Sequence, residues 1–487
     1  MSQQEPAPAI AACRARIAAG PPAIAARNEL VDLLRGAGRL EEAQAECRAL
    51  IALQPDHVGA RIALGGLLID LQRPVEAEAQ LREALAHRLD PSLPELEIHR
   101  AEALQNLRRY DEAIVTYRQA LARQPRDPAA HRYYNDLLYR LGRKDDFLKS
   151  YDLAPRTPDL LMGKAYFLNH ESRFDEAYAT YGEALARDPG NVLAVLGAVE
   201  SLRGMKRYDE AAAALGLLLQ RAGDEPHLIA RAAEVALLQR DPRTAATLCE
   251  RGLRAAPHDQ SCLVGLSLAW RMLDDARDEA LSGYDRYIRA FDLKAPEGFS
   301  SMADFNAELS AYLGRLHPDT REYVNQSLRG GTQTPDHIFG VGHELVDRLE
   351  RRIAEAVADY IDDLEGDETH PFVSRRARSF LYRGSWSSQL KAQGFHVNHI
   401  HPQGWISSCY YVAVPDAAKD TQTRQGWIKF GEPGFDVGLS NPIRRMIQPV
   451  PGRLVLFPSF MWHGTVPFTD DARRTTIAFD VVPQSGP

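Results

Sequence analysis

The sequence has little cysteine and no long apolar run. Its five cysteines are far apart and form no CxxC pair, which argues against a disulfide framework or a thiolate zinc site and favours a reducing cytoplasmic location. No apolar run reaches the roughly 18 residues that a membrane helix needs. The first residues lack a basic segment followed by an apolar one, so we also expect no secretory signal. A membrane partner is therefore not expected.

The sequence also lacks a long basic run. The formal net charge is −8, and arginine pairs such as Arg351-Arg352 and Arg375-Arg376 are scattered. Such pairs are typical of solvated faces, so we expect no nucleic-acid partner. The hydrophobic content of 45% and charged content of 25% are those of a soluble globular protein. A chain of 487 residues is long enough for about two to four domains.

The first half of the chain is repetitive. An alanine in similar surroundings recurs at steps of 34, 36, 64, 34 and 34 residues, at Ala43, Ala77, Ala113, Ala177, Ala211 and Ala245. The 64-residue step hides one irregular unit around residues 144–147. A proline closes several units at matching places, namely Pro55, Pro125, Pro189 and Pro257.

This pattern resembles the tetratricopeptide repeat (TPR), in which 34 residues form two antiparallel helices. The small alanine suits close helix approach, and the proline ends a helix because it lacks an N–H. One unit cannot bury its apolar stripe alone, so stacking makes the core. We expect a tail or first helix over 1–20 and an all-α TPR solenoid of about seven units over 21–275. The resemblance implies a groove for a protein or peptide partner; a purely supporting scaffold is the alternative.

Residues 276–370 lose the period but keep helical patterns. Ser301 with Asp304 three residues later is typical of a capped helix start, and 344–364 has apolar residues at four-residue steps. We expect a helical bridge that packs on the next domain. Between these helices, residues 326–334 combine two glycines with hydroxyl and amide groups, which predicts either a ligand-approaching loop or a tight turn. Arg329 and Gln333 are its candidate substrate contacts.

Residues 371–487 are β-rich. Short strand patterns lie at 379–382, 406–414, 426–430, 453–457 and 475–482, with Pro-Gly turn signals between some of them. Regularly spaced short strands indicate an all-β sandwich or barrel.

The densest histidine cluster falls at residues 396–402. In an unbroken strand His399 and His401 share one face, and His396 and Asn398 the other. His463 follows 62 residues after His401. Iron(II) that activates oxygen needs two or three fixed imidazole or carboxylate ligands and open positions. Arg474, at the start of the last strand pattern, offers the donor fork that a 2-oxoglutarate carboxylate needs.

Residues 386–482 resemble the 2-oxoglutarate/Fe(II) oxygenase family, through matching stretches at 384–387, 394–402, 404–412 and 456–464, followed by Arg474. The resemblance implies a double-stranded β-helix (jelly-roll, cupin-like) barrel with flanking helices, and so a multidomain α + β chain. It implies Fe(II), 2-oxoglutarate and O2 as cofactors and cosubstrate. By this likeness His399 and His463 are iron ligands, and Arg474 anchors 2-oxoglutarate.

The third ligand departs from the usual His-x-Asp or His-x-Glu. It is His401 if the motif starts at His399, or Asn398 if it starts at His396. We expect the set His399, His401 and His463, with His396, Asn398 and His463 as the alternative. In the first case His396 and Asn398 contact substrate or support the ligands.

Neighbouring residues supply further candidates. Tyr410, Tyr411 and Ser408 are candidate residues of the cosubstrate pocket, although a place in the core is the alternative for the two tyrosines. Trp405 is a candidate either for contacting the substrate or for supporting the metal ligands. The expected function is a dioxygenase that hydroxylates a protein or peptide recruited by the repeats. The alternatives are an inactive TPR scaffold with a vestigial barrel, and a cupin-like metal enzyme that does not use 2-oxoglutarate.

Overall fold

The computed structural model of the chain describes residues 6–20, 23–71, 73–87, 94–317, 326–334 and 337–484. They belong to two compact units, Met1–Gly163 and Lys164–Pro487. None of the helices in these described ranges is both long and apolar enough to cross a membrane. The domain boundaries expected from the sequence stay predictions, because the division between the two units falls inside the repeat array.

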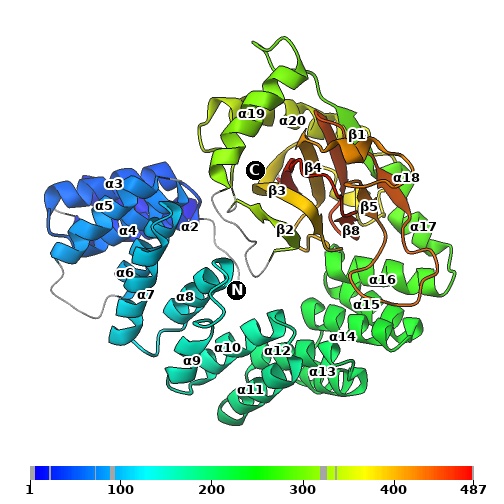
Figure 1. Cartoon of the computed structure of the whole chain (residues 1–487), viewed down its shortest axis with the longest axis horizontal. Helices are drawn as coiled ribbons and strands as arrows, with labels where there is room; N and C mark the ends of the chain where they lie inside the picture. Colours follow the sequence, from blue (N-terminus) through cyan, green and yellow to red (C-terminus); the bar gives the residue numbers. More distant parts are fainter. Residues whose placement is uncertain are drawn as a thin grey trace. The chain divides into compact units, whose positions relative to one another are not determined.

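The first unit is made of helices (Figure 1). They are α1 (Pro6–Ala18), α2 (Ile24–Gly36), α3 (Leu40–Leu53), α4 (Val58–Asp70), α5 (Pro74–Ala86), α6 (Pro94–Asn106), α7 (Tyr110–Arg123), α8 (Pro128–Arg140), α9 (Lys149–Leu153) and the start of α10 (Pro158–His170). The residues around 144–147 form turns, and α9 has only five residues. The repeat made by α8 and α9 is therefore irregular, as the sequence predicts.

The second unit begins with further helices of the same kind. They are α11 (Phe174–Arg187), α12 (Val192–Gly204), α13 (Tyr208–Ala222), α14 (Pro226–Leu238), α15 (Pro242–Ala255), α16 (Gln260–Met272), α17 (Arg277–Ser282) and α18 (Tyr284–Tyr287). Within the described residues, α2 to α15 form seven consecutive pairs, which confirms the helical solenoid.

The recurring alanines explain the pairing. All six are fully buried, with 0% of their surface exposed: Ala43, Ala77, Ala113, Ala177, Ala211 and Ala245. Each lies in the first turn of the second helix of its pair, where the absence of a larger side chain lets the helices approach. Pro55, Pro125, Pro189 and Pro257 each follow two residues after such a helix ends.

The rest of the second unit builds two sheets. The strands of the large sheet run in the order β1-β7-β4-β9-β3-β2 and those of the small one in the order β6-β5-β8. They are β1 (Arg289–Asp292), β2 (Leu328–Gln333), β3 (Phe380–His396), β4 (Ile406–Ala413), β5 (Ile428–Phe430), β6 (Arg445–Ile447), β7 (Arg453–Pro458), β8 (His463–Thr465) and β9 (Arg474–Pro483). The described strands close no barrel, so the β-sheet region is confirmed and the double-stranded β-helix stays a prediction.

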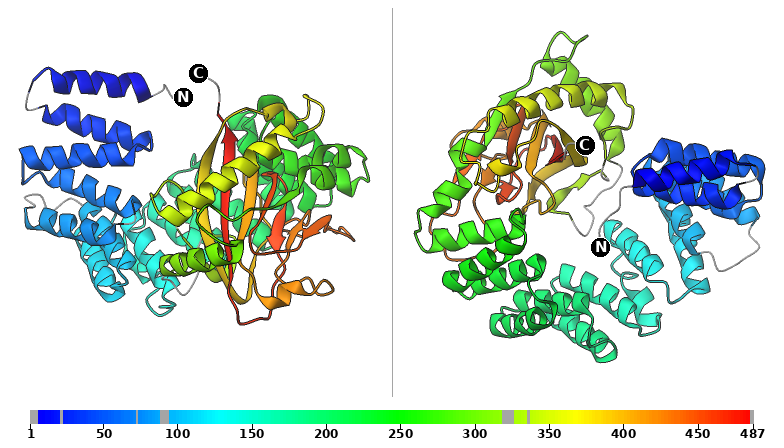
Figure 2. Two further views of the ribbon diagram at one scale, coloured as in Figure 1. Left: turned by 90° about the horizontal axis from the view of Figure 1, so that it is seen from above. Right: turned by 180° about the vertical axis from the view of Figure 1, so that it is seen from behind.

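Helices cover one face of the large sheet. Ser301 caps α19 (Met302–Leu316) by accepting a 3.1 Å hydrogen bond from the Asp304 amide, as its sequence predicts. Helix α20 (Glu344–Asp362) buries its apolar stripe in the same core as α19 and the strands. Figure 2 shows this helix lying across the sheet. The small sheet contributes Phe430 to the same core, where its ring meets Phe457 of β7 at 5.0 Å.

The predicted helical bridge also contributes two strands. β1 pairs with β7, and β2 forms the edge of the large sheet beside β3. The expectation of a loop or tight turn at 326–334 is therefore wrong for Leu328–Gln333. Two glycines made this segment look like a turn, but Gly331 lies close against the β3 backbone, which leaves no room for a side chain.

Candidate metal centre

Three histidines from two separate segments converge at one end of the sheets. β3 ends at His396, so the strand is broken before the next histidines, contrary to the unbroken strand assumed above. His399 then pairs with His463 of β8: each backbone amide donates to the other's carbonyl, at 2.9 and 3.0 Å. This pairing sets His399, His401 and His463 with ring nitrogens all within 4.8 Å of one another.

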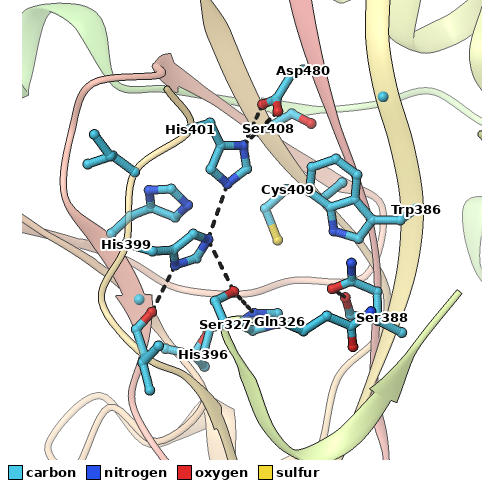
Figure 3. Close-up of a pocket in the computed structure, with 18 of the residues that line it drawn as sticks. Gln326, Ser327, Trp386, Ser388, His396, His399, His401, Ser408, Cys409 and Asp480 are labelled. Carbon is cyan, nitrogen blue, oxygen red and sulfur yellow. Dashed lines mark hydrogen bonds and ion pairs between the residues drawn. The ribbon is translucent and has the colours of Figure 1, made fainter. Parts of the chain in front are cut away.

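The Nδ1 atom of each of these rings is already engaged by an acceptor. The Nδ1–H of His399 donates to the Val397 carbonyl at 2.8 Å, and that of His463 donates to the Met461 carbonyl at 3.0 Å. His401 donates to the Asp480 carboxylate, at 2.6 and 2.8 Å to its two oxygens (Figure 3). A neutral imidazole with its proton on Nδ1 keeps a lone pair on Nε2. The Nε2 atoms of His399 and His401 are 3.1 Å apart, so these lone pairs face one another.

Burial favours the neutral form of two of these rings, His399 and His463. It lowers the pKa of His399 to about 3 and holds the pKa of His463 well below the usual range, with neighbouring histidines adding to both effects. A metal ion binds the neutral ring, so the arrangement is prepared for a cation rather than for protons.

Asp480 is a member of the site that the sequence argument did not name. Its carboxylate accepts from His401 and, at 2.5 Å, from the Ser407 hydroxyl. The signal was present: Arg474, Thr476, Ala478 and Asp480 alternate along β9 and all line one cavity. Extending the alternation by two residues would have found it.

Arg474 lies in the same cavity as the triad. The cavity has a volume of ≈ 920 Å³. The Arg474 side chain is only 1% exposed, donates from Nε to the Gly426 carbonyl at 3.1 Å, and has its guanidinium 5.0 Å from the Tyr411 ring centre. No carboxylate among the described residues pairs with it. A buried cation of this kind is costly unless an anion joins it.

Some predicted residues have other roles. Tyr410 points to the helical side of the sheet, where its hydroxyl donates to Asn306 of α19 at 2.8 Å. Strand alternation places Cys409 and Tyr411 on the side of Arg474 instead. Ser408 lines the cavity, with its hydroxyl bonded to the Phe479 backbone. The pocket role of Tyr410 is therefore wrong, and its core alternative holds.

Trp405 belongs to the core as well. It is 1% exposed and donates from Nε1 to the Phe372 carbonyl at 3.0 Å. It does not line the cavity, so the expectation of a substrate contact is wrong. Trp405 is close to the histidines in sequence, but burial of its large apolar ring in the core determines where its side chain lies.

The remaining candidates divide between the cavity and its surroundings. His396 and Gln333 line the cavity, and Nδ1 of His396 lies 3.2 Å from the Ser327 hydroxyl. Asn398 instead donates to the Glu432 carboxylate at 3.0 Å, so the alternative set of His396, Asn398 and His463 is not assembled. The Arg329 guanidinium is used by the backbone carbonyls at the start of its own strand.

Comparisons with known proteins divide the chain in the same way. Residues 384–480 match the family described as "Putative 2OG-Fe(II) oxygenase". Tetratricopeptide-repeat families match residues 34–96, 168–235 and 99–160. The chain thus carries TPR repeats in its N-terminal region and an oxygenase-family domain over 384–480. No curated protein matches it.

Solved structures similar to this chain include the following three, each less than 20% identical to it. Yeast Tom70 has 19% identity, with 56% of this chain and 60% of that chain covered and a TM-score of 0.43. A tetratricopeptide repeat protein from Parabacteroides merdae has 16% identity and a TM-score of 0.33. The match covers 50% of this chain and 98% of that chain. A chain of the APC/C hetero-tetramer Cut9-Hcn1 has 19% identity and a TM-score of 0.32. The match covers 54% of this chain and 52% of that chain. The match therefore spans about half of that last chain.

Proposed function

We propose that the protein is a non-haem iron(II) and 2-oxoglutarate-dependent oxygenase that hydroxylates its substrate. One observation carries the proposal. Three imidazoles converge in a cavity that also holds the buried guanidinium of Arg474, which pairs with no carboxylate among the described residues. A candidate cation site and a candidate anion site thus share one cavity, as a metal and a dicarboxylate that chelates it require.

The donor set fits iron(II). His399, His401 and His463 offer three nitrogen ligands, and imidazole suits iron among other first-row metals. Three ligands leave open positions for a cosubstrate and oxygen. No carboxylate ligates directly in this set, but Asp480 stands behind His401 and supplies a negative charge one ring away. Such a partner fixes the ring and raises the basicity of the ligating nitrogen.

Arg474 fits the far carboxylate of 2-oxoglutarate. Its planar fork can bind a carboxylate through two parallel hydrogen bonds. The Gly426 carbonyl and the Tyr411 ring hold the guanidinium in place before any ligand arrives. Little conformational freedom is then lost on binding.

The protein's own residues orient the ligand groups and form the wall of the cavity. Bound iron and 2-oxoglutarate would supply O2 activation, with succinate and CO2 released and one oxygen atom placed on a substrate C–H bond. Asp480 keeps the proton on Nδ1 of His401 and so keeps Nε2 available. Trp386 lines the cavity 5.6 Å from the His401 ring and contributes an apolar wall.

Succinate release tests the proposal. The iron-loaded full chain should convert 2-oxoglutarate to succinate with consumption of O2, at a rate that rises with a suitable substrate. His463→Ala should bind iron weakly and lose this turnover, while His87→Ala, a half-exposed repeat histidine, should behave as wild type. Failure of the wild-type chain to retain iron, together with turnover unaffected by His463→Ala, would overturn the proposal and favour an inactive scaffold.

A further inference from the structure

The wall of the metal cavity is not made by the sheets alone. Glu200 of α12 and Arg231 of α14 line the same cavity as His399 and Trp386. These two charged residues come from the late repeats. The repeats therefore contribute directly to the space in front of the metal ligands, in addition to any distant recruiting surface.

A loop of the sheet region fixes this arrangement. Residues 431–442 run from the end of β5 to the repeats, where Val437 is 4% exposed in a core shared with α14, α15 and α16. Arg271 of α16 donates to the carbonyls of Gly431 and Pro442, at 2.5 and 2.8 Å. Arg240 pairs with Asp436 at 3.2 Å. The loop thus holds α14 beside the sheet region, and Arg203 of α12, whose guanidinium lies 6.0 Å from the Phe435 ring centre, joins α12 to the same loop.

The repeat residues at the cavity form a charge network. Arg203 donates to Glu200 at 2.5 Å and to Glu234 at 2.6 Å, and Arg231 donates to Glu234 at 3.0 Å. Two guanidinium groups thus share two carboxylates, and Glu234 serves both. The Arg231 side chain lines the cavity and is still 54% exposed, so it keeps donors for a further partner.

Arg383 of β3 also lines the cavity, and it adds a positive charge that no described carboxylate balances. Its guanidinium meets only the neutral Gln403 side chain, at 3.2 and 3.4 Å, and no carboxylate among the described residues pairs with it. We call the three charged residues Glu200, Arg231 and Arg383, all of which line the cavity, its rim; together they carry one excess positive charge. The whole chain carries −8, so this local excess stands against the overall sign.

We propose that this rim binds an acidic peptide segment of a protein substrate, with Arg231 and Arg383 pairing with a carboxylate beside the residue that the metal centre oxidises. Repeat arrays offer extended surfaces for polypeptides, and here such a surface runs into the cavity. Charge complementarity selects the partner more than it adds raw affinity. The oxidation step rests on the proposed function; the binding step does not.

Charge-patterned peptides test the binding step. Pools of fluorescent peptides, with a randomised centre and acidic, neutral or basic flanks, are titrated against the zinc-loaded full chain while anisotropy is recorded. We expect the acidic pool to bind most tightly, with an affinity that falls as salt rises. Arg383→Glu should weaken the acidic pool by about tenfold and favour the basic pool.

Matched variants make the outcome decisive. Arg378→Glu changes an exposed arginine five residues earlier that does not line the cavity, and it should leave the preference unchanged. Arg231→Gln tests the repeat side without adding a charge. Equal binding of the three pools, or an acidic preference that survives both Arg383→Glu and Arg231→Gln, would overturn the inference. His463→Ala should lose metal but keep the acidic preference, so failure of the oxygenase assignment remains distinguishable.

Discussion

At the scale of single residues, the metal centre depends on where protons sit on three rings. Each Nδ1–H has an acceptor in the protein, so each Nε2 is left for a metal. Two acceptors are backbone carbonyls, and only His401 has a charged one. Asp480 is therefore the residue through which the charge of the site can be changed without touching a ligand.

Asp480→Asn should lower metal affinity about 10- to 100-fold with the fold retained. The amide can still accept from His401, but it removes the negative charge that makes Nε2 a stronger donor. Competition titration with zinc or cobalt measures the change. Asp471→Asn, an exposed acid before β9, is the matched control. Equal metal affinity in Asp480→Asn and wild type would contradict the role assigned to the carboxylate.

His317 makes stability depend on pH. Its ring bridges the hydroxyls of Thr332 and Ser387, both at 3.0 Å, and burial lowers its pKa from 6.5 to about 4. Below pH 6.5 the unfolded chain takes up this proton before the folded one does, so the free energy of unfolding falls as pH falls toward 4. Between pH 7 and 5 the loss from this ring is about 2 kcal/mol.

His317→Gln should remove that part of the pH dependence. The amide can keep both hydrogen bonds but does not titrate. Urea unfolding followed by tryptophan fluorescence reports on the second unit, because all five tryptophans lie in it. The variant should lose less stability than wild type between pH 7 and 5. An identical loss in both proteins would show that other groups account for it.

Sequence spacing predicted which histidines meet, but not every neighbour. The HxH pair and the distal histidine stand out because three polar rings within six residues are uncommon in a core. Tyr410 was misplaced because the facing of β4 depends on its tertiary pairing with β7 and β9, which one strand's sequence does not show. Strand alternation places Asp480 on the face of Arg474, but its partner His401 lies 79 residues away, so its role at the metal site has no local signal.

At the scale of elements, the edge strand β2 depends on glycine. A Cβ on Gly331 would lie 2.2 Å from the Gln389 carbonyl oxygen of β3. This approach lets β2 pair with β3 across a register shift between Arg329 and Gly331. The local composition favours a turn, and only the tertiary pairing makes the segment a strand.

Gly331→Ala should therefore destabilise the second unit by about 1–3 kcal/mol. Gly314→Ala in α19 is the opposite case, since nothing lies within 4 Å of its added Cβ. That change should stabilise by about 0.5–1 kcal/mol because alanine favours a helix. Urea unfolding midpoints compare the two. A stabilising Gly331→Ala would contradict the close approach between β2 and β3.

At the scale of the whole molecule, the helical repeats could be predicted from the sequence, but the order of the strands in the sheets could not. The helical pairs repeat locally, so the solenoid could be read from spacing, small residues and prolines. The sheets join distant segments: Arg289 of β1 is paired with Leu456 of β7, 167 residues later. Such pairings leave no local signal, which is why β1 and β2 were absent from the predicted bridge.

The central claim is that one cavity holds a metal and 2-oxoglutarate together. Anaerobic equilibrium binding of 2-oxoglutarate to the iron(II)-loaded full chain tests it most directly. Arg474→Ala should weaken binding about 100-fold or more, because a buried charge pair is lost. Arg473→Ala, whose guanidinium bonds to Gln389 at 2.9 Å, should bind as wild type. Tight binding only with metal present and Arg474 intact is the predicted result; metal-independent binding, or equal binding by Arg474→Ala, would contradict the account.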